Sequence, residues 1–173
     1  MTTISAITVA LVLILTGCNG GKKDDPVSLP EKRISVDEVR LKDLNGQAIN
    51  LGKYKGKTIF LNFWATWCKP CKDEMPSIER AQKMLLDENI VFLVASGESA
   101  EAITEFKTNN GYPFSYTQIE NSEELDILAL PTTFIFDASG TLVFSEMGSR
   151  QWDEDKNIDL IRKIINKNDS SFL

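Results

Sequence analysis

The sequence predicts a single α/β domain built as a three-layer sandwich, in which helices cover both faces of a sheet. Two apolar runs, 58–65 and 90–95, are each followed by a stretch of helical periodicity. A hairpin pattern over 132–144 and a final helical pattern complete the order, which is typical of a mixed sheet covered by helices. With 173 residues, 42% of them hydrophobic and 25% charged, the chain can form such a core without disulfide cross-links.

The N-terminal part of the domain is expected to form a hairpin and then a central strand. Apolar and polar residues alternate over 39–51 around Asn45-Gly46, the dipeptide most typical of a two-residue hairpin turn. Residues 58–65 are nearly all apolar, with Asn62 as the polar exception. Such a run is typical of a strand that is covered on both faces.

The middle of the chain alternates helical and strand patterns. A helical pattern runs from Cys68 to about Glu88, and Pro76 is expected to kink it because proline lacks a backbone N–H. Residues 90–95 form a second apolar strand. Residues 99–109 form a second helix whose apolar positions recur at helical spacing.

The last third is expected to contain a short strand at 114–117 and a short helix at 123–128. A hairpin follows over 132–144, with turn residues at 137–140. The closing helix covers about 153–165, where isoleucines at helical spacing form an apolar stripe.

The beginning of the chain is interpreted as a secretory signal. Residues 4–15 are apolar but too few to span a membrane. Leu15-Thr16-Gly17-Cys18 resembles the bacterial lipobox, in which the cysteine becomes the lipidated mature N-terminus, although no Lys or Arg precedes the apolar stretch. The alternative is an N-terminal membrane anchor that stays uncleaved. Either interpretation places the domain in an envelope compartment, where disulfides are permitted.

These features divide the chain into four segments. The stretch after Cys18 is polar and glycine-rich, so it cannot bury a core and is expected to be flexible. The expected order is a lipoprotein signal peptide, a tether, the folded domain and a C-terminal tail, at residues 1–17, 18–32, 33–167 and 168–173.

Charge and composition exclude several functions. The net charge of −6 argues against a nucleic-acid-binding protein, which needs a basic face. The chain has no histidine, which excludes Cys-His and Ser-His catalysis and removes the commonest transition-metal ligand. Proton transfer must therefore use a carboxylate, a thiol or water.

Cys68 and Cys71 lie where the strand pattern gives way to the helical one. Positions three apart share one face of a helix, so the two sulfurs can meet. The N-terminus of a helix favours the thiolate, which is the reactive form. We therefore expect reversible thiol–disulfide exchange. Cys68 is the expected attacking thiol, half exposed and stabilised by free backbone N–H groups and Lys69, and Cys71 is the shielded resolving thiol.

Other uses of the cysteine pair fit less well. Zinc requires four ligands, and without histidine only Cys18 remains as a third sulfur, so we expect no metal site. A haem attachment site requires a histidine where Lys72 stands. A static disulfide would close a very small loop with little effect on chain entropy. Redox activity is the favoured interpretation.

Two separated motifs resemble the signatures of thioredoxin-fold proteins. The segment FWATWCKPC at 63–71 is similar to their active-site segment, and LPTTF at 130–134 is similar to their second signature. Pro76 matches their helix proline. The N-terminal hairpin and the long stretch before the second signature resemble the envelope-tethered TlpA/ResA group. The resemblance spans roughly 36–165 and implies a thioredoxin fold with an N-terminal hairpin and a central insertion.

The resemblance also implies how clients bind. Pro131 is expected in the cis form, facing the cysteines, although most prolines are trans. Leu130 is expected to offer its backbone to an extended client segment, as in β-augmentation. Trp67, just before the pair, and Pro70, between its two cysteines, complete the expected client-binding residues. No dissociable cofactor is implied, because the electrons pass through the cysteines.

A proton acceptor for Cys71 is less clearly indicated. Thioredoxin-like proteins often place a buried aspartate under the second cysteine, but Asn62, which cannot titrate, stands at the matching position. Glu74, one helical turn after Cys71, matches an acidic residue of the ResA-like proteins and is the candidate catalytic base. The alternative is a solvated carboxylate on an exposed helix face, and both interpretations stay open here.

The resemblance therefore implies an envelope-anchored thiol–disulfide oxidoreductase, facing the periplasm or the cell surface. Its Lys-Pro dipeptide resembles that of reducing members and differs from the Pro-His of strong oxidants. The implied partners are disulfide-containing envelope proteins, with apocytochrome c as one candidate, and a membrane electron donor that re-reduces the pair. The alternative from another class is a thioredoxin-fold module that binds clients without turnover. A peroxidase relative would need a differently placed reactive cysteine.

The lipobox interpretation predicts that the mature protein begins at Cys18 and carries acyl chains. Two or more chains give stable membrane attachment, whereas one chain gives only marginal binding. Intact-mass and peptide mass spectrometry of the protein from a membrane fraction measures this directly. An intact Met1 or an unmodified Cys18 would contradict the prediction.

Overall fold

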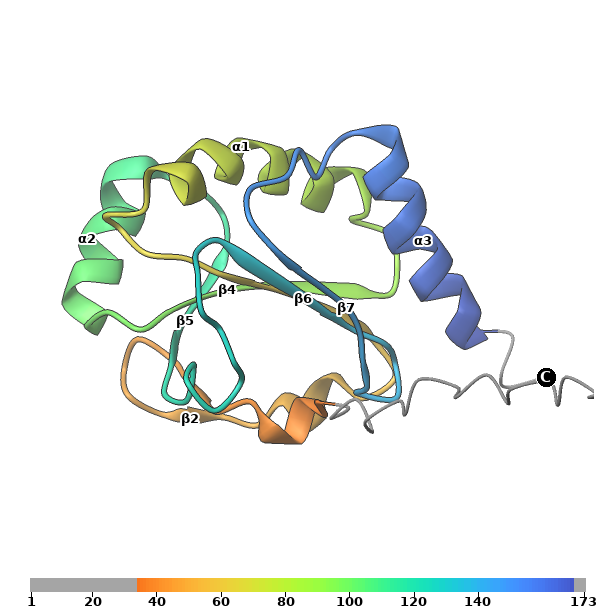
Figure 1. The fold of residues 1–173 in the computed structure, drawn as a ribbon, viewed down its shortest axis with the longest axis horizontal. Helices are drawn as coiled ribbons and strands as arrows, with labels where there is room; N and C mark the ends of the chain where they lie inside the picture. The colour runs from red at the N-terminus through yellow and green to blue at the C-terminus, as the bar shows by residue number, and fades with distance from the viewer. Residues whose placement is uncertain (1–33, 170–173) are drawn as a thin grey trace, which may run out of the picture. The chain divides into compact units, whose positions relative to one another are not determined.

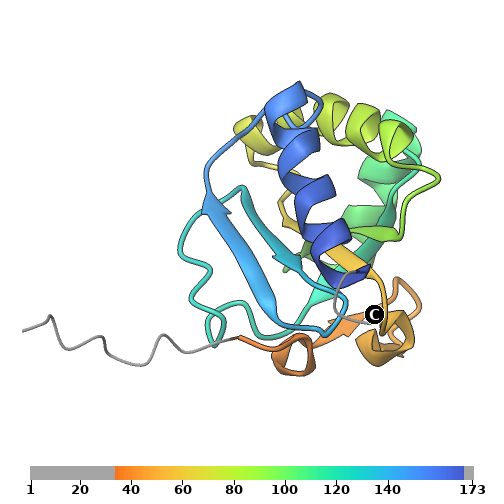
Figure 2. The same ribbon diagram turned by 90° about the vertical axis from the view of Figure 1, so that its right-hand side faces the viewer.

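The computed structural model describes residues 34–169 (Figures 1 and 2). The chain divides into two units, residues 1–31 and 32–173, and every element described below belongs to the second. The expected signal peptide and the lipidated Cys18 lie outside the described residues. No helix among residues 34–169 has the length and apolarity needed to cross a membrane.

The described residues form one mixed sheet in the order β2-β1-β5-β4-β3-β6-β7. Strands β3, β4 and β5 run parallel to one another, and the remaining neighbours pair antiparallel. The fully buried β3 lies between β4 and β6. The strands are β1 Leu41–Lys42, β2 Ala48–Ile49, β3 Thr58–Phe63, β4 Ile90–Ser96, β5 Ser115–Ile119, β6 Thr132–Phe136 and β7 Leu142–Met147.

All three α-helices pack on one face of this sheet (Figure 1). They are α1 Lys69–Met84, α2 Ala100–Asn110 and α3 Asp155–Asp169. The chain moves in one direction across the sheet from β3 to β4 to β5, and parallel crossovers are right-handed, so α1 and α2 must lie on the same side. Buried side chains of all three helices share one apolar cluster with Phe60 of β3 and Ile135 of β6.

The opposite face is covered by short elements. Two 3₁₀ helices, Val36–Glu38 and Leu51–Tyr54, and the segment 120–131 pack there against β3, β4 and β6. The thioredoxin fold is therefore as predicted, but the expectation of α-helices on both faces is wrong. The helix expected at 123–128 is instead a series of turns, because Asp126 has φ 55°, a left-handed conformation through which a helix cannot continue.

The other predicted elements are present with small shifts. The hairpin around Asn45-Gly46 pairs β1 with β2. Helix α1 continues through Pro76 but ends at Met84 rather than near Glu88. The chain leaves the α-helix in a tighter turn, in which the N–H of Leu86 donates to the carbonyl of Lys83, three residues back rather than four.

Gly140 and Gly56 form a matched pair for testing how the N-terminal segment is held. Their φ angles are 85° and 87°, so alanine at either site is strained. An added Cβ at Gly140 would lie 2.7 Å from Cγ1 of Val36, whereas at Gly56 nothing lies within 4 Å. We predict that Gly56→Ala costs about 1–2 kcal/mol, and that Gly140→Ala costs more because Val36 must also move. Urea unfolding measures both, and equal losses would contradict the predicted clash.

Candidate active site

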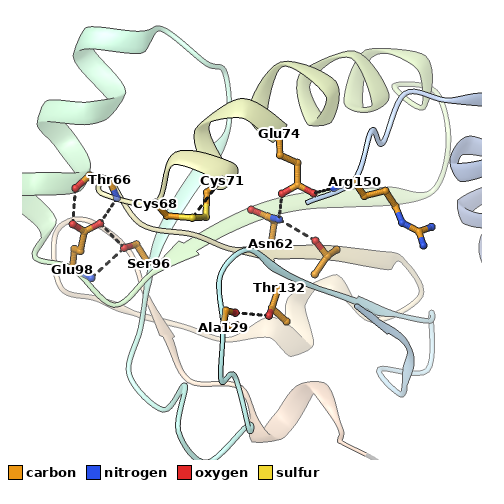
Figure 3. Close-up of a disulfide and its surroundings, with 11 residues drawn as sticks. Asn62, Thr66, Cys68, Cys71, Glu74, Ser96, Glu98, Ala129, Thr132 and Arg150 are labelled. Atoms are coloured by element: carbon orange, nitrogen blue, oxygen red, sulfur yellow. Dashed lines mark hydrogen bonds between the residues drawn. A yellow bond between two sulfur atoms is a disulfide. The ribbon is translucent and has the colours of Figure 1, made fainter. Parts of the chain in front are cut away.

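A disulfide joins Cys68 and Cys71 at the N-terminus of α1 (Figure 3). Cys68 is the N-cap residue, and its Sγ accepts a hydrogen bond from the backbone N–H of Cys71 at 3.2 Å. Pro70 lies in the first turn, where its missing N–H needs no partner. The helix N-terminus thus presents a backbone donor to the Cys68 sulfur, which favours a thiolate once the pair is reduced.

Cys68 is more buried than expected, whereas Cys71 is shielded as predicted. Cys68 is 4% exposed and Cys71 is 1% exposed, so the expectation of a half-exposed Cys68 is wrong. The pair packs into the apolar cluster on the helical face of the sheet, which accounts for the burial. Lys69 pairs with Asp73 at 2.5 Å, so its charge is shared with that carboxylate. The adjacent Trp67 is 72% exposed, and Lys69 and Pro70 are exposed as well.

The Leu130–Pro131 peptide bond is cis, as the resemblance implied. Phe63 pairs with Thr132, so Pro131 lies beside the start of the loop that carries the cysteines. Leu130 and Trp67 both line a cavity of about 290 Å³ next to this loop. The sheet thus brings together the two sequence motifs, which are far apart in the chain.

Glu74 is fully buried, so the interpretation as a solvated helix carboxylate is wrong. It lies three residues after Cys71 and shares the inward face of α1 with it. Oε1 accepts hydrogen bonds from the backbone N–H of Arg150 at 3.1 Å and from the indole N–H of Trp152 at 2.5 Å. Oε2 accepts one from the side-chain amide of Asn62 at 3.3 Å (Figure 3).

Burial raises the pKa of Glu74 to about 7. Desolvation of the charged form is the main cause, and the negative charge of Glu146 adds to it. The N–H groups of Arg150, Trp152 and Asn62 oppose the shift because they stabilise the carboxylate. A carboxyl group with this pKa can both accept and release a proton near neutral pH.

Asn62 connects Glu74 to the strand that follows the cis proline. It is 1% exposed, and its amide donates to Oγ1 of Thr133 at 2.9 Å as well as to Glu74. Asn62 and Thr133 are direct partners in the register of β3 and β6. The polar exception in the apolar run is therefore part of a buried hydrogen-bonded network.

Sequence reasoning missed Glu98, which holds the loop before Cys68. Its carboxylate accepts hydrogen bonds from the backbone N–H and the hydroxyl of Thr66, each at 2.6 Å, and from the hydroxyl of Ser96 at 3.1 Å (Figure 3). Glu98 follows β4, and the carboxyl ends of parallel strands meet at one edge of a sheet. Applied to the apolar runs 58–65 and 90–95, this rule could have placed Glu98 near the cysteine loop from the sequence alone.

Sequence reasoning also missed Trp152. It is fully buried, and it reaches Glu74 from the segment between β7 and α3. No local pattern marks it, because its contact with Glu74 joins residues 78 positions apart.

Among residues 34–169, no group of three His, Cys, Asp or Glu side chains is arranged to hold a metal ion. The site contains the two sulfurs and the carboxyl group of Glu74, together with backbone and amide N–H donors. This fold and site define a thioredoxin-fold redox protein.

Comparison with known proteins supports this class. The pattern of the AhpC/TSA family matches residues 35–145, more than half of the chain. The chain belongs to the AhpC/TSA family.

Named relatives agree with the resemblance to the ResA group. The chain is 37% identical over 107 residues to the thiol-disulfide oxidoreductase ResA of Bacillus subtilis (strain 168), a match that spans only 60% of this chain and 60% of ResA. It is 30% identical over 148 residues to the thioredoxin-like protein YneN of the same organism, covering 80% of this chain and 87% of YneN. These relatives and the Cys68–Cys71 pair confirm the predicted class, a thiol–disulfide oxidoreductase.

A solved structure agrees with the fold. The thiol:disulfide interchange protein of Chlorobium tepidum TLS, a thioredoxin family protein, superposes with a TM-score of 0.58 at 24% identity. The match covers 70% of this chain and 92% of that one. The predicted thioredoxin fold is confirmed.

The raised pKa of Glu74 predicts that its contribution to stability depends on pH. The folded protein keeps the Glu74 proton up to about pH 7, whereas the unfolded chain releases it near 4.5. The stabilisation by this proton is thus fully present below pH 4.5 and is lost as the pH rises to about 7. We predict that the oxidised wild type loses about 3 kcal/mol more than Glu74→Gln across this interval.

Urea unfolding as a function of pH measures the difference between the two proteins. Glu105→Gln, which removes an exposed carboxylate on α2, is the control and should follow the wild type. An equal loss of unfolding free energy in Glu74→Gln and in the wild type would contradict the raised pKa of Glu74.

Proposed function

We propose that this protein reduces disulfides in client proteins of the cell envelope through Cys68 and Cys71. The observation that carries the proposal is the position of the cysteine pair at the N-terminus of α1, beside the cis bond before Pro131. The relatives named thiol-disulfide oxidoreductases support it. Apocytochrome c is one candidate client.

The reaction begins with the reduced pair. The Cys68 thiolate attacks a sulfur of the client disulfide, so a Cys68–client bond forms and the client S–S bond breaks. The released client sulfur leaves as a thiolate and takes a proton from water. The N–H of Cys71, which already points at the Cys68 sulfur, stabilises the attacking thiolate.

The second step closes the enzyme disulfide. Cys71 gives its proton to the Glu74 carboxylate and attacks the Cys68 sulfur. The Cys68–Cys71 bond forms, the Cys68–client bond breaks, and the second client sulfur leaves as a thiolate. Two electrons pass from the cysteine pair to the client. The oxidised pair described above is the enzyme product of this step.

Client binding is assigned to the surface around the pair. Trp67 offers an exposed apolar ring, and Pro70 is exposed in the first turn of α1. Leu130, half buried before the cis bond, offers its backbone to an extended client segment. The cavity shared by Trp67 and Leu130 supports this assignment.

The proposal includes an envelope location. A lipid anchor at Cys18 would hold the domain at a membrane, facing the periplasm or the cell surface, and a membrane electron donor would re-reduce the cysteines. The resemblance of Leu15-Thr16-Gly17-Cys18 to the lipobox supports this part of the proposal.

An insulin-reduction assay separates this function from a binding module. The domain should reduce insulin disulfides in the presence of dithiothreitol, with turnover that depends on both cysteines. Client binding that is unchanged in a variant lacking both thiols, together with no reduction of insulin, would favour the binding module.

Single cysteine variants test the order of the two attacks. Cys68→Ser is expected to abolish both reduction and client capture. Cys71→Ser is expected to abolish turnover but to accumulate mixed disulfides through Cys68, because only the resolving step is lost. Non-reducing gels of the two variants with insulin measure this. Equal trapping by both variants would overturn the assignment of Cys68 as the attacking thiol.

A further inference from the structure

The two oxygens of the Glu74 carboxylate have unequal environments. Oε1 accepts from two N–H groups, the indole of Trp152 at 2.5 Å and the backbone of Arg150 at 3.1 Å. Oε2 has only the longer 3.3 Å bond from Asn62. Oε1 is thus held by two donors, and Oε2 is the oxygen better placed to take a proton.

The segment that carries Trp152 is itself bound to α1. The backbone N–H of Trp152 donates to the hydroxyl of Ser77 at 3.1 Å, and this hydroxyl lies 3.2 Å from the carbonyl oxygen of Arg150. The Trp152 ring packs edge-on against Phe60, with 4.8 Å between ring centroids. These contacts hold the Trp152 side chain in one rotamer, so its indole N–H has a fixed position.

Among residues 34–169, no positive charge is directed at the Glu74 carboxylate. The guanidinium of Arg150 is paired with Glu146 and donates to Asn157, so its charge is directed away from Glu74. The groups that face Glu74 are Glu146 from β7, Arg150 from the following segment, Asn62 from β3 and, once reduced, Cys71 from α1. Two further groups contact these partners: Thr133 from β6 contacts Asn62, and Asn157 from α3 contacts Arg150. Donated N–H groups therefore supply the stabilisation of the carboxylate.

We propose that Trp152 is a positioning residue for the resolving step: its indole N–H fixes Oε1 of Glu74, which stabilises the ionised carboxylate and leaves Oε2 to accept the proton of Cys71. This rests on the proposed function, in which Glu74 takes that proton. Removing the indole N–H deprives the carboxylate of a charge-assisted hydrogen bond. Glu74 then stays protonated to higher pH, and the resolving step begins at higher pH.

Stopped-flow reaction of the reduced protein with Ellman's reagent separates the two attacks. The first coloured thiolate is released when Cys68 attacks, and the second when Cys71 displaces the aryl thiol from Cys68. Trp152→Phe is expected to raise the pH midpoint of the second phase by about one to two pH units, with the first phase unchanged. Glu74→Gln is expected to slow the second phase roughly 100-fold.

Two comparisons show whether Trp152 acts through Glu74. In the double variant Trp152→Phe/Glu74→Gln, the second phase should match that of Glu74→Gln alone. Trp64→Phe is the matched control, because Trp64 is also buried but its indole N–H has no hydrogen-bond partner among the described residues. Whatever it does to the rates, Trp64→Phe should leave the pH midpoint of the second phase unchanged.

A measurement on the unsubstituted protein covers the case in which Trp152→Phe does not fold. The chain has three tryptophans, and Trp67 is exposed, so the indole ¹⁵N–¹H signals provide internal references. The Trp152 signal should titrate near pH 7 in the wild type and not in Glu74→Gln, while the Trp64 and Trp67 signals should not titrate with it.

The outcomes distinguish this inference from the proposed function. An unchanged midpoint in Trp152→Phe, an equal shift in the Glu74→Gln background, or a Trp152 signal that does not titrate would overturn the role of Trp152. A second phase that is unaffected by Glu74→Gln would overturn the role of Glu74 and of Trp152 with it, while leaving the cysteine chemistry intact. The absence of any second phase in the wild type would overturn the proposed function itself.

Discussion

The burial of the Glu74 carboxylate is the constraint around which the site is organised. A carboxyl group inside an apolar cluster is unfavourable unless hydrogen bonds satisfy it. Here three donors come from two parts of the chain: Asn62 on β3, and Arg150 and Trp152 in the segment before α3. This requirement binds the C-terminal part of the domain to the helix that carries the redox sulfurs, so packing and chemistry depend on the same contacts.

Topology explains why the site forms at one edge of the sheet. The strands β3 and β4 are parallel, so the loop with Cys68 and the residues after β4 meet at their carboxyl ends. The antiparallel β6 brings Pro131 to the same edge from the other side. Because both crossovers place their helices on one face, the opposite face is left to short elements and to the segment that leads into the cis bond.

Two carboxylates near the pair lie in different environments. Glu98 is partly exposed and is used to hold Thr66, through two hydrogen bonds of 2.6 Å, in the loop before Cys68. Glu74 is fully buried, and burial brings its pKa to about 7. Glu74 is thereby suited to exchange a proton near neutral pH, in a chain that has no histidine.

The sequence by itself determined the parts of this protein that depend on local chemistry. The apolar run of β3, the Asn45-Gly46 turn and the Cys68/Cys71 spacing each carry their own signal, and a family resemblance was needed for the cis form of Pro131. Only the tertiary structure decided which side chains of the site are buried. The structure shows that Glu74 is a buried carboxyl group rather than a surface one, and that Cys68 is buried. It also shows that Trp152 donates a hydrogen bond to Glu74, 78 residues away in the sequence. Burial and hydrogen bonding between distant segments depend on the order of the strands in the sheet and on the face that each crossover helix covers. Local sequence patterns do not specify either of these.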